Sequence, residues 1–141
     1  MKKIAVIYWS GTGNTQAMAS AVADGAEETG AKTLVLTPSE FDIALLDEFD
    51  GIAFGCPAMG AETLEETEFE PLFASCEPML DGRRIVLFGS YGWGEGEWMK
   101  TWEQRCIDAG ALLACDSVIC ADTPDSNIIN LCKAAGKTLA T

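Results

Sequence analysis

The sequence predicts a single α/β domain built around a doubly wound parallel β-sheet. Its 141 residues fit one domain better than two, because independent domains usually contain about 100–150 residues. Short apolar runs recur along the chain with helical patterns between them, as expected for strands that helices cover on both faces. No repeat, low-complexity tract or linker interrupts this pattern, so we expect residues 1–141 to form one domain.

The first half of the chain contains three predicted strands. The apolar run Ile4–Tyr8 is the first, and a polar loop connects it to a helix over Thr15–Thr29, where small and apolar residues recur at helical spacing. The second strand is Thr33–Thr37. A connection with a short helical stretch near Asp42–Leu46 then leads to the third strand, Asp50–Cys56.

The second half continues the alternation with two strands and three helices. A short helix is predicted after Glu68, as far as about Cys76, and a fourth strand over Arg84–Ser90. A helix over Glu97–Ala109, a fifth strand over Leu112–Ala121 and a last helix over Ser126–Leu139 follow. The strand order is not visible in the sequence. In doubly wound sheets a ligand binds at the carboxyl ends of the strands, so the loops after strands one, three and four are the candidates for function.

Charge and the absence of histidine exclude several classes of function. Nine basic residues stand against 22 acidic ones, and the net charge of −13 should repel nucleic acid and anionic membranes. Without histidine, Ser-His-Asp and Cys-His catalysis are excluded. The N-terminal apolar run is too short for a signal segment or a membrane span. We therefore expect a cytoplasmic monomer that binds neither nucleic acid nor membranes.

The six cysteines predict neither a metal site nor a disulfide framework. The chain has no C-x-x-C pair and no histidine for a zinc site, and a domain of this length does not need disulfides. We interpret the cysteines as reduced, small buried residues. Cys115 and Cys120, five residues apart on one predicted strand, should face opposite sides of the sheet and so cannot pair.

The loop after the first strand is typical of a phosphate site. Its residues are Ser10, Gly11, Thr12, Gly13, Asn14 and Thr15. Unpaired backbone N–H groups and the dipole at the start of a helix attract an anion, and two glycines let the backbone come close. Four short polar side chains add donors, and no cation lies in the loop. The alternative is an ordinary helix start capped by Asn14 or Thr15.

Other phosphate motifs fit this loop poorly. A Walker A loop needs a lysine, and the dinucleotide fingerprint needs a third glycine where Gln16 stands. A cysteine phosphatase loop would need a cysteine and an arginine in this turn, and neither is present. Phosphate binding without hydrolysis is the remaining interpretation.

The loops after the third and fourth strands supply walls for a flat ring. Trp93 has a glycine on each side, which leaves its indole free to cover an aromatic ligand; the alternative is that it packs on its own loop. Met59 fits either a ligand wall or a gap filler in the core. Among the glutamates between positions 62 and 70, Glu62 is closest to the site and could accept a hydrogen bond from a ligand. We expect most of the other glutamates to form a solvated face.

Four segments together resemble a flavodoxin of the short-chain, clostridial type. They are Tyr8–Thr15, Ala58–Gly60, Leu64–Pro71 and Leu87–Gly94. The resemblance covers essentially the whole chain, and the S-x-T-G-N-T and S-Y-G-W-G segments are specific in combination. It implies non-covalent binding of flavin mononucleotide (FMN) and single-electron transfer between redox enzymes, by a carrier that is not itself an enzyme. It also implies a five-stranded sheet in the order 2-1-3-4-5, as the middle layer of a three-layer sandwich.

The resemblance further implies which residues bind FMN. The phosphate would lie in the 10–15 loop, with Trp9 along the ribityl chain. Met59 would lie on the inner face of the isoalloxazine ring and Trp93 on the outer face, while Glu62 would accept from the ring N3–H. The whole set is Trp9, Ser10, Gly11, Thr12, Gly13, Asn14, Thr15, Ala58, Met59, Gly60, Ala61, Glu62, Ser90, Tyr91, Gly92, Trp93 and Gly94, with no metal ligand.

Gly60 and the net charge would set the electron chemistry. In the family this peptide flips on reduction so that its carbonyl accepts from the protonated N5, which stabilises the neutral semiquinone; glycine readily takes the positive φ required. A second electron yields an anionic hydroquinone, and a protein of charge −13 disfavours that anion, so the carrier works at low potential. The same charge would steer the protein to basic docking patches on its redox partners.

Two departures from the clostridial pattern and two rival functions complete the prediction. Ala61 replaces an aspartate and Pro57 a serine that can donate to the phosphate, and we expect both to change FMN affinity or reduction potential without abolishing binding.

The first rival function, an FMN-dependent reductase, would need a substrate space beside the ring. Trp93 and the lack of a long extra loop argue against such a space. A receiver-type signalling domain would need an acidic cluster and a phosphoacceptor aspartate at the strand ends, whereas Asp50 precedes its strand.

Overall fold

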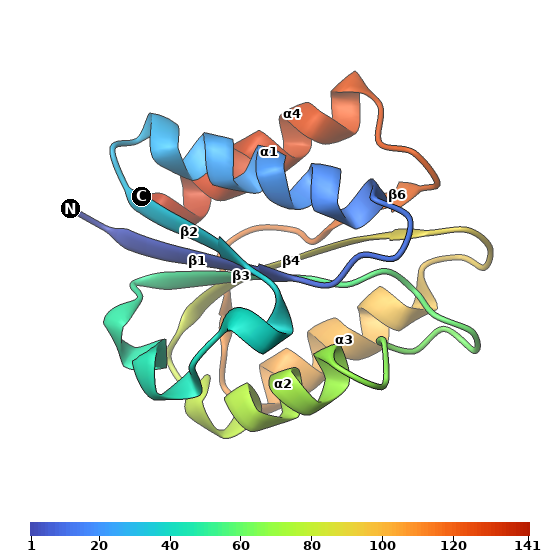
Figure 1. The fold of residues 1–141 in the computed structure, drawn as a ribbon, viewed down its shortest axis with the longest axis horizontal. Helices are drawn as coiled ribbons and strands as arrows, with labels where there is room; N and C mark the ends of the chain where they lie inside the picture. The colour runs from blue at the N-terminus through green and yellow to red at the C-terminus, as the bar shows by residue number, and fades with distance from the viewer.

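A computed structural model describes residues 1–141, which form three layers with a parallel sheet in the middle (Figure 1). The strands are β1 (Lys3–Tyr8), β2 (Lys32–Leu36), β3 (Gly51–Gly55), β4 (Arg84–Tyr91), β5 (Leu112–Leu113) and β6 (Val118–Ala121). They follow the order β2-β1-β3-β4-β5, with β6 also pairing with β4, and every pair is parallel. The predicted fold class and strand order are confirmed.

Helices cover both faces of the sheet. The α-helices are α1 (Asn14–Glu28), α2 (Phe69–Cys76), α3 (Glu97–Asp108) and α4 (Ser126–Ala140), and the 3₁₀ turns are η1 (Pro38–Glu40), η2 (Ile43–Glu48) and η3 (Glu77–Met79). Figure 1 shows α1 and α4 on one face and α2 and α3 on the other. The predicted helices are all present, and the short helical stretch after the second strand is the 3₁₀ turn η2. None of the helices is long and apolar enough to span a membrane.

The sheet separates two hydrophobic cores, because successive side chains of a strand point to opposite faces. On β1, Ile4 and Val6 pack in the core beneath α1 and α4, while Ala5 and Ile7 pack in the core beneath α2 and α3. Trp98 and Trp102, four residues apart on one face of α3, are buried in the second core.

The contact between α1 and α4 depends on two glycines within the helices. A Cβ atom at Gly136 would lie 2.0 Å from the carbonyl oxygen of Val22, and one at Gly25 would lie 2.0 Å from that of Lys133. Such contacts are far shorter than van der Waals distance, so the two helix backbones approach as closely as they do only because both side chains are absent.

The predicted fifth strand is wrong in one respect, because it is broken in the middle. Between Leu113 and Val118 the chain advances five residues while their partners on β4, Ile85 and Phe88, are three apart, so two extra residues leave the ladder. Polar side chains occupy the break, and the Ser117 hydroxyl donates to the Glu103 carboxylate at 2.7 Å. A sheet has no place for such residues between two apolar faces.

All six cysteines are free, and all are buried except Cys115, which is half-buried. Burial raises the pKa of the Cys132 thiol to about 12, which favours the protonated form. The prediction that Cys115 and Cys120 face opposite sides is wrong. The break in the strand cancels the alternation, and both pack with the core beneath α1 and α4.

Candidate functional site

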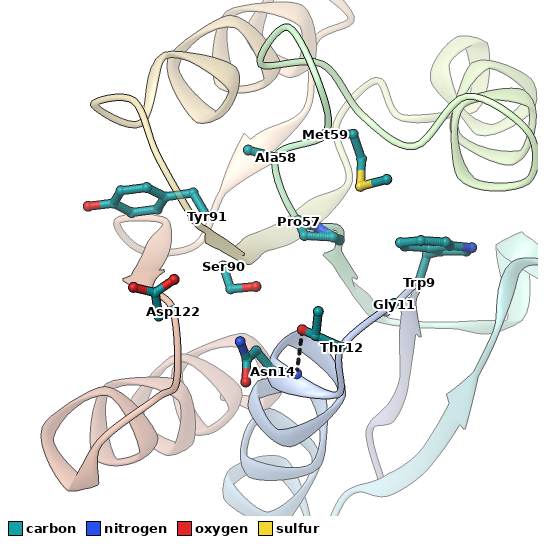
Figure 2. Close-up of a pocket in the computed structure, with 11 residues that line it drawn as sticks. Trp9, Gly11, Thr12, Asn14, Pro57, Ala58, Met59, Ser90, Tyr91 and Asp122 are labelled. Carbon is teal, nitrogen blue, oxygen red and sulfur yellow. Dashed lines mark hydrogen bonds between the residues drawn. The ribbon is translucent and has the colours of Figure 1, made fainter.

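A cavity of about 230 Å³ lies at the carboxyl edge of the sheet, between the loops that follow β1, β3, β4 and β6 (Figure 2). Its lining residues are Trp9, Gly11, Thr12, Asn14, Pro57, Ala58, Met59, Ser90, Tyr91, Gly92 and Asp122. The chain leaves β1 toward β2 on one side and resumes at β3 on the other, which makes this edge the topological switch point of the sheet. The cavity therefore lies where doubly wound folds place their ligands.

The first turn of α1 borders the cavity and has no side-chain cap. Its N-cap residue is Gly13, at φ 97°, and the first turn contains no acidic residue. The backbone N–H groups of Thr15 and Gln16 have no acceptor within the protein. The alternative of a helix capped by Asn14 or Thr15 is thus wrong. Free N–H groups and the positive end of the helix dipole are available to an anion.

The hydroxyls of this turn already have partners within the protein, and that of Thr12 accepts from the backbone N–H of Asn14 at 3.5 Å (Figure 2). The Ser10 hydroxyl accepts from the backbone N–H of Gly13 at 3.0 Å, which shapes the turn. The hydroxyls of Thr15 and Ser90 are hydrogen-bonded at 3.1 Å, and both residues are buried. This bond connects the start of α1 to the end of β4. It therefore fixes the loop after β1 relative to the loop after β4.

The loop after β3 is a tight hairpin. Met59 and Thr63 exchange two backbone hydrogen bonds, of 2.8 and 3.1 Å, and the N–H of Ala58 donates to the carbonyl of Ser90 at 2.9 Å. Gly60 stands at the turn with φ 42°, and no atom lies within 4 Å of the place where its Cβ would be. The left-handed backbone at Gly60 favours glycine, although a side chain there would meet no other segment of the protein.

Glu65 anchors the base of this hairpin. Its buried carboxylate accepts from the backbone N–H groups of Thr67, Glu68 and Phe69, at 2.7–2.9 Å, and from the hydroxyl of Thr67. Burial would raise the pKa of this carboxyl, but the hydrogen bonds outweigh burial and lower it to about 2. Glu65 also donates its own N–H to the Cys56 sulfur at 3.3 Å. Glu65 is therefore an exception to the solvated face expected for these glutamates.

The loop after β4 completes the site. Trp93 is 66% exposed, so its indole is not part of the core and is open to a ligand. The Glu62 carboxylate accepts from the backbone N–H of Glu97 at 3.2 Å, and Glu62 itself has φ 58°. This bond connects the loop after β3 to the start of α3. Gly94 has φ 87°, which favours glycine, and a Cβ there would lie 2.6 Å from the Glu62 carboxylate, which would have to move.

Nine of the 17 predicted site residues line the cavity: Trp9, Gly11, Thr12, Asn14, Ala58, Met59, Ser90, Tyr91 and Gly92. The other eight lie beside it in the same three loops: Ser10, Gly13, Thr15, Gly60, Ala61, Glu62, Trp93 and Gly94. The predicted set omits Asp122, because it draws only on the loops after strands one, three and four. The rule that ligands bind at carboxyl ends applies equally to the fifth strand and would have found it.

Comparison with known proteins identifies the family. The family model Flavodoxin matches residues 6–135. The flavodoxin of Megasphaera elsdenii is 39% identical over 137 residues, which cover 97% of this chain and 98% of the relative. That of Clostridium beijerinckii is 41% identical over 120 residues, which cover 85% and 87%. The chain belongs to the flavodoxin family.

The structural comparison agrees for this flavodoxin. The solution structure of two-electron reduced Megasphaera elsdenii flavodoxin superposes with a TM-score of 0.88 at 40% identity, over 97% of this chain and 98% of the other. The short-chain clostridial type implied by the sequence is confirmed. This flavodoxin is therefore an FMN-binding electron carrier with redox partners, and it is not an enzyme.

The residues around the cavity fit FMN. The uncapped start of α1 and the hydroxyl of Thr12 and amide of Asn14 form a neutral donor set suited to a phosphate. Met59 and Trp9, on one side of the cavity, offer apolar and aromatic surface to a ligand (Figure 2). No group of three or more His, Cys, Asp or Glu side chains could hold a metal ion.

Proposed function

We propose that this cavity and its three predicted loops hold FMN for low-potential electron transfer to partners with basic docking patches. The observation that carries the proposal is the uncapped first turn of α1, which opens into the cavity at the switch point of the sheet. Free backbone donors at a helix start, next to neutral side-chain donors and without a basic residue, suit a phosphate that is bound and not hydrolysed.

The 10–15 loop and Trp9 would bind the phosphate and the ribityl chain. Thr12 and Asn14 line the cavity with side chains that can donate to phosphate oxygens. Pro57 lines the same cavity and has no hydroxyl to donate. The phosphate would consequently depend more heavily on the backbone N–H groups of α1.

The other two loops would enclose the ring. When bound, FMN supplies the ability to accept and release single electrons. Met59 and the exposed Trp93 would shield the ring from water, Glu62 would accept from a ring N–H, and the backbone of Gly92 and Gly94 would face the same edge. Gly60, which stands at the turn with a positive φ, would present its carbonyl to a protonated ring nitrogen.

The charge distribution supports docking by the cofactor edge. Segments 9–13, 56–68, 92–96 and 122–125 at this edge contain no basic residue and seven acidic ones: Glu62, Glu65, Glu66, Glu68, Glu95, Asp122 and Asp125. The opposite edge is mixed in charge: Asp47, Glu48, Asp50 and Asp81 stand there with five of the nine basic residues, Lys2, Lys3, Lys32, Arg83 and Arg84. Such asymmetry would orient the protein toward a basic partner. We further propose a monomer in the cytoplasm, where its six free thiols stay reduced.

A titration of the flavin-free protein with FMN and with riboflavin tests the phosphate assignment. We expect FMN to bind at least about tenfold more tightly, since charge-assisted hydrogen bonds to the phosphate contribute about 1.5–3 kcal/mol each. Thr12→Val should reduce this preference for FMN, while Thr101→Val, at an exposed position on α3, should not. Equal affinity for FMN and riboflavin would contradict the assignment.

A further inference from the structure

Asp122 is the only charged residue among the eleven that line the cavity. It follows β6 directly, and its carboxylate takes part in no hydrogen bond and in none of the protein's six ion pairs. A carboxylate at a ligand site with no cation to offset it acts on any charge that the ligand acquires.

The backbone holds Asp122 in this place by an unusual conformation. Its φ is 59°, and only one other non-glycine residue in the chain, Glu62, has a positive φ. The N–H of Asp122 donates to the carbonyl of Tyr91 at 2.8 Å, and its carbonyl accepts from the Cys120 thiol at 3.6 Å. Aspartate is among the non-glycine residues that take this conformation most readily, and the bonds to Tyr91 and Cys120 fix it here.

The Asp122 carboxylate lies close to the start of the loop that follows β4. The pairing of Tyr91 with Ala121 brings the ends of β4 and β6 together. An ideal Cβ on Gly92 would lie 3.8 Å from the Asp122 carboxylate oxygen. Gly92 belongs to the loop that the proposed function assigns to the ring, and Figure 2 shows the Asp122 carboxylate beside Tyr91. Any effect of Asp122 on the ring therefore rests on the proposed function.

We infer that Asp122 sets the reducing strength of the bound cofactor. When an electron arrives without a proton, the ring gains one negative charge, and the Asp122 carboxylate disfavours that charge. The oxidised ring is neutral and is affected far less. The affinity for reduced FMN is thereby lowered relative to that for oxidised FMN, which makes the bound cofactor a stronger electron donor.

The test compares Asp122→Asn with Asp125→Asn. Asparagine tolerates positive φ and keeps the shape of aspartate. Asp125 carries the same charge three residues further on, but its carboxylate accepts from the N–H of Ile128 at 2.9 Å, at the start of α4, and it does not line the cavity. Asparagine also serves as an N-cap, so the control variant should fold normally.

Two measurements test whether the Asp122 carboxylate acts on the reduced cofactor more than on the oxidised one. Fluorescence titration gives the affinity for oxidised FMN, and stepwise anaerobic reduction with dithionite in the presence of reference dyes gives the potentials. For Asp122→Asn we expect reduced FMN to gain about three- to thirtyfold in affinity over oxidised FMN, since one removed charge acts at short range. At about 59 mV per tenfold for one electron, this equals about 30–90 mV. Riboflavin should show the same shift, because the ring and not the phosphate is involved.

Asp125→Asn should change this ratio by less than about twofold, and added salt should diminish the Asp122→Asn effect. Equal shifts in the two variants would overturn the inference and leave the proposed function intact. Weaker binding of oxidised FMN by Asp122→Asn would also overturn it, because the carboxylate would then be a hydrogen-bond acceptor for the ligand. A wild-type protein that bound no FMN would overturn the proposed function as well.

Discussion

At the scale of single residues, Glu65 links the β3 loop to α2. Its N–H contacts the sulfur at the end of β3, and its carboxylate receives the free N–H groups at the start of α2. The hairpin that carries Gly60 begins and ends at these two points. Glu65 is not among the residues predicted to bind the cofactor, but its hydrogen bonds fix the loop that carries Gly60, which is among them.

Acid should weaken the fold through Glu65. The pKa of this carboxyl is about 2 in the folded protein and about 4.3 in an unfolded chain. The ionised group therefore stabilises the fold above pH of about 4.3, and this contribution is lost as the pH falls toward 2. Glu65→Gln should lower the free energy of unfolding at pH 7 by about 2–3 kcal/mol and flatten its pH dependence between about 4.3 and 2. Urea unfolding of both proteins at several pH values measures both effects.

The exposed neighbour Glu66 provides the control. Glu66→Gln changes the net charge equally and should alter the unfolding free energy by less than about 0.5 kcal/mol. If the two variants lost the same stability, or if Glu65→Gln kept the wild-type pH dependence, the carboxylate would not be the stabilising group.

At this scale the sequence predicts a site residue only where the residue type and its neighbours suit a ligand better than a core. Trp93 between glycines and the polar, glycine-containing S-x-T-G-N-T loop both suit a ligand better than a core, and the structure brings both loops to one edge. Glu65 is indistinguishable in sequence from the four glutamates around it, because burial depends on where the hairpin folds. Asp122 lies in a loop whose partners are distant in sequence, and only the pairing of β6 with β4 brings it to the cavity.

At the scale of elements, the close contact between α1 and α4 should reverse the usual effect of replacing a helical glycine by alanine. Replacing a helical glycine by alanine usually stabilises a helix by about 1 kcal/mol. For Gly136→Ala we expect instead a loss of about 1–3 kcal/mol, because the new Cβ would overlap the Val22 carbonyl and force the helices apart. Asn130→Ala, at an exposed position of α4, is the control and should be neutral or stabilising. Thermal unfolding gives the Tm of both variants and of the unchanged protein. A Tm for Gly136→Ala above that of the unchanged protein would show that the two helices can separate without loss of stability.

The elements themselves were largely predictable because each has a signal within its own residues. Apolar runs, helical spacing and glycines at helix ends place every strand and helix within a few residues of its observed bounds. The break between β5 and β6 has only a weak signal, the polar pair Asp116 and Ser117, because the rest of Leu112–Ala121 is apolar enough to pass for one strand. It arises because the residues between the two segments leave the ladder of β4, which is a tertiary relation.

At the scale of the whole molecule, charge is uneven along the strand direction: the cofactor edge is acidic without a basic residue, and the opposite edge is mixed. Both termini lie at the end of the molecule opposite the cofactor edge, and the basic strand starts lie with them (Figure 1). The sequence predicts an acidic protein that favours basic partners. The uneven distribution of charge becomes visible only when parallel strands place all their starts at one edge and all their ends at the other.

Charge reversal at the two edges should therefore have unequal effects. The reduced flavodoxin can be mixed in a stopped-flow instrument with a small, basic, oxidised haem protein, and the electron-transfer rate followed. Glu95→Lys, beside the cavity, should slow transfer about two- to fivefold at low salt and much less at high salt. Glu27→Lys, near the far end of α1, changes the net charge equally and should have little effect. Equal slowing by both would mean that net charge, and not its direction, controls association.

The break in the fifth strand also protects the molecule from self-association. β5 offers only two residues to the ladder and β6 only four, so neither presents the long, flat row of unpaired amides on which another chain could add a strand. The opposite border is different, since β2 is an unbroken run of five residues with Leu34 and Val35 both exposed. If this protein aggregates during folding or on prolonged storage, the growth of intermolecular sheet should start from β2.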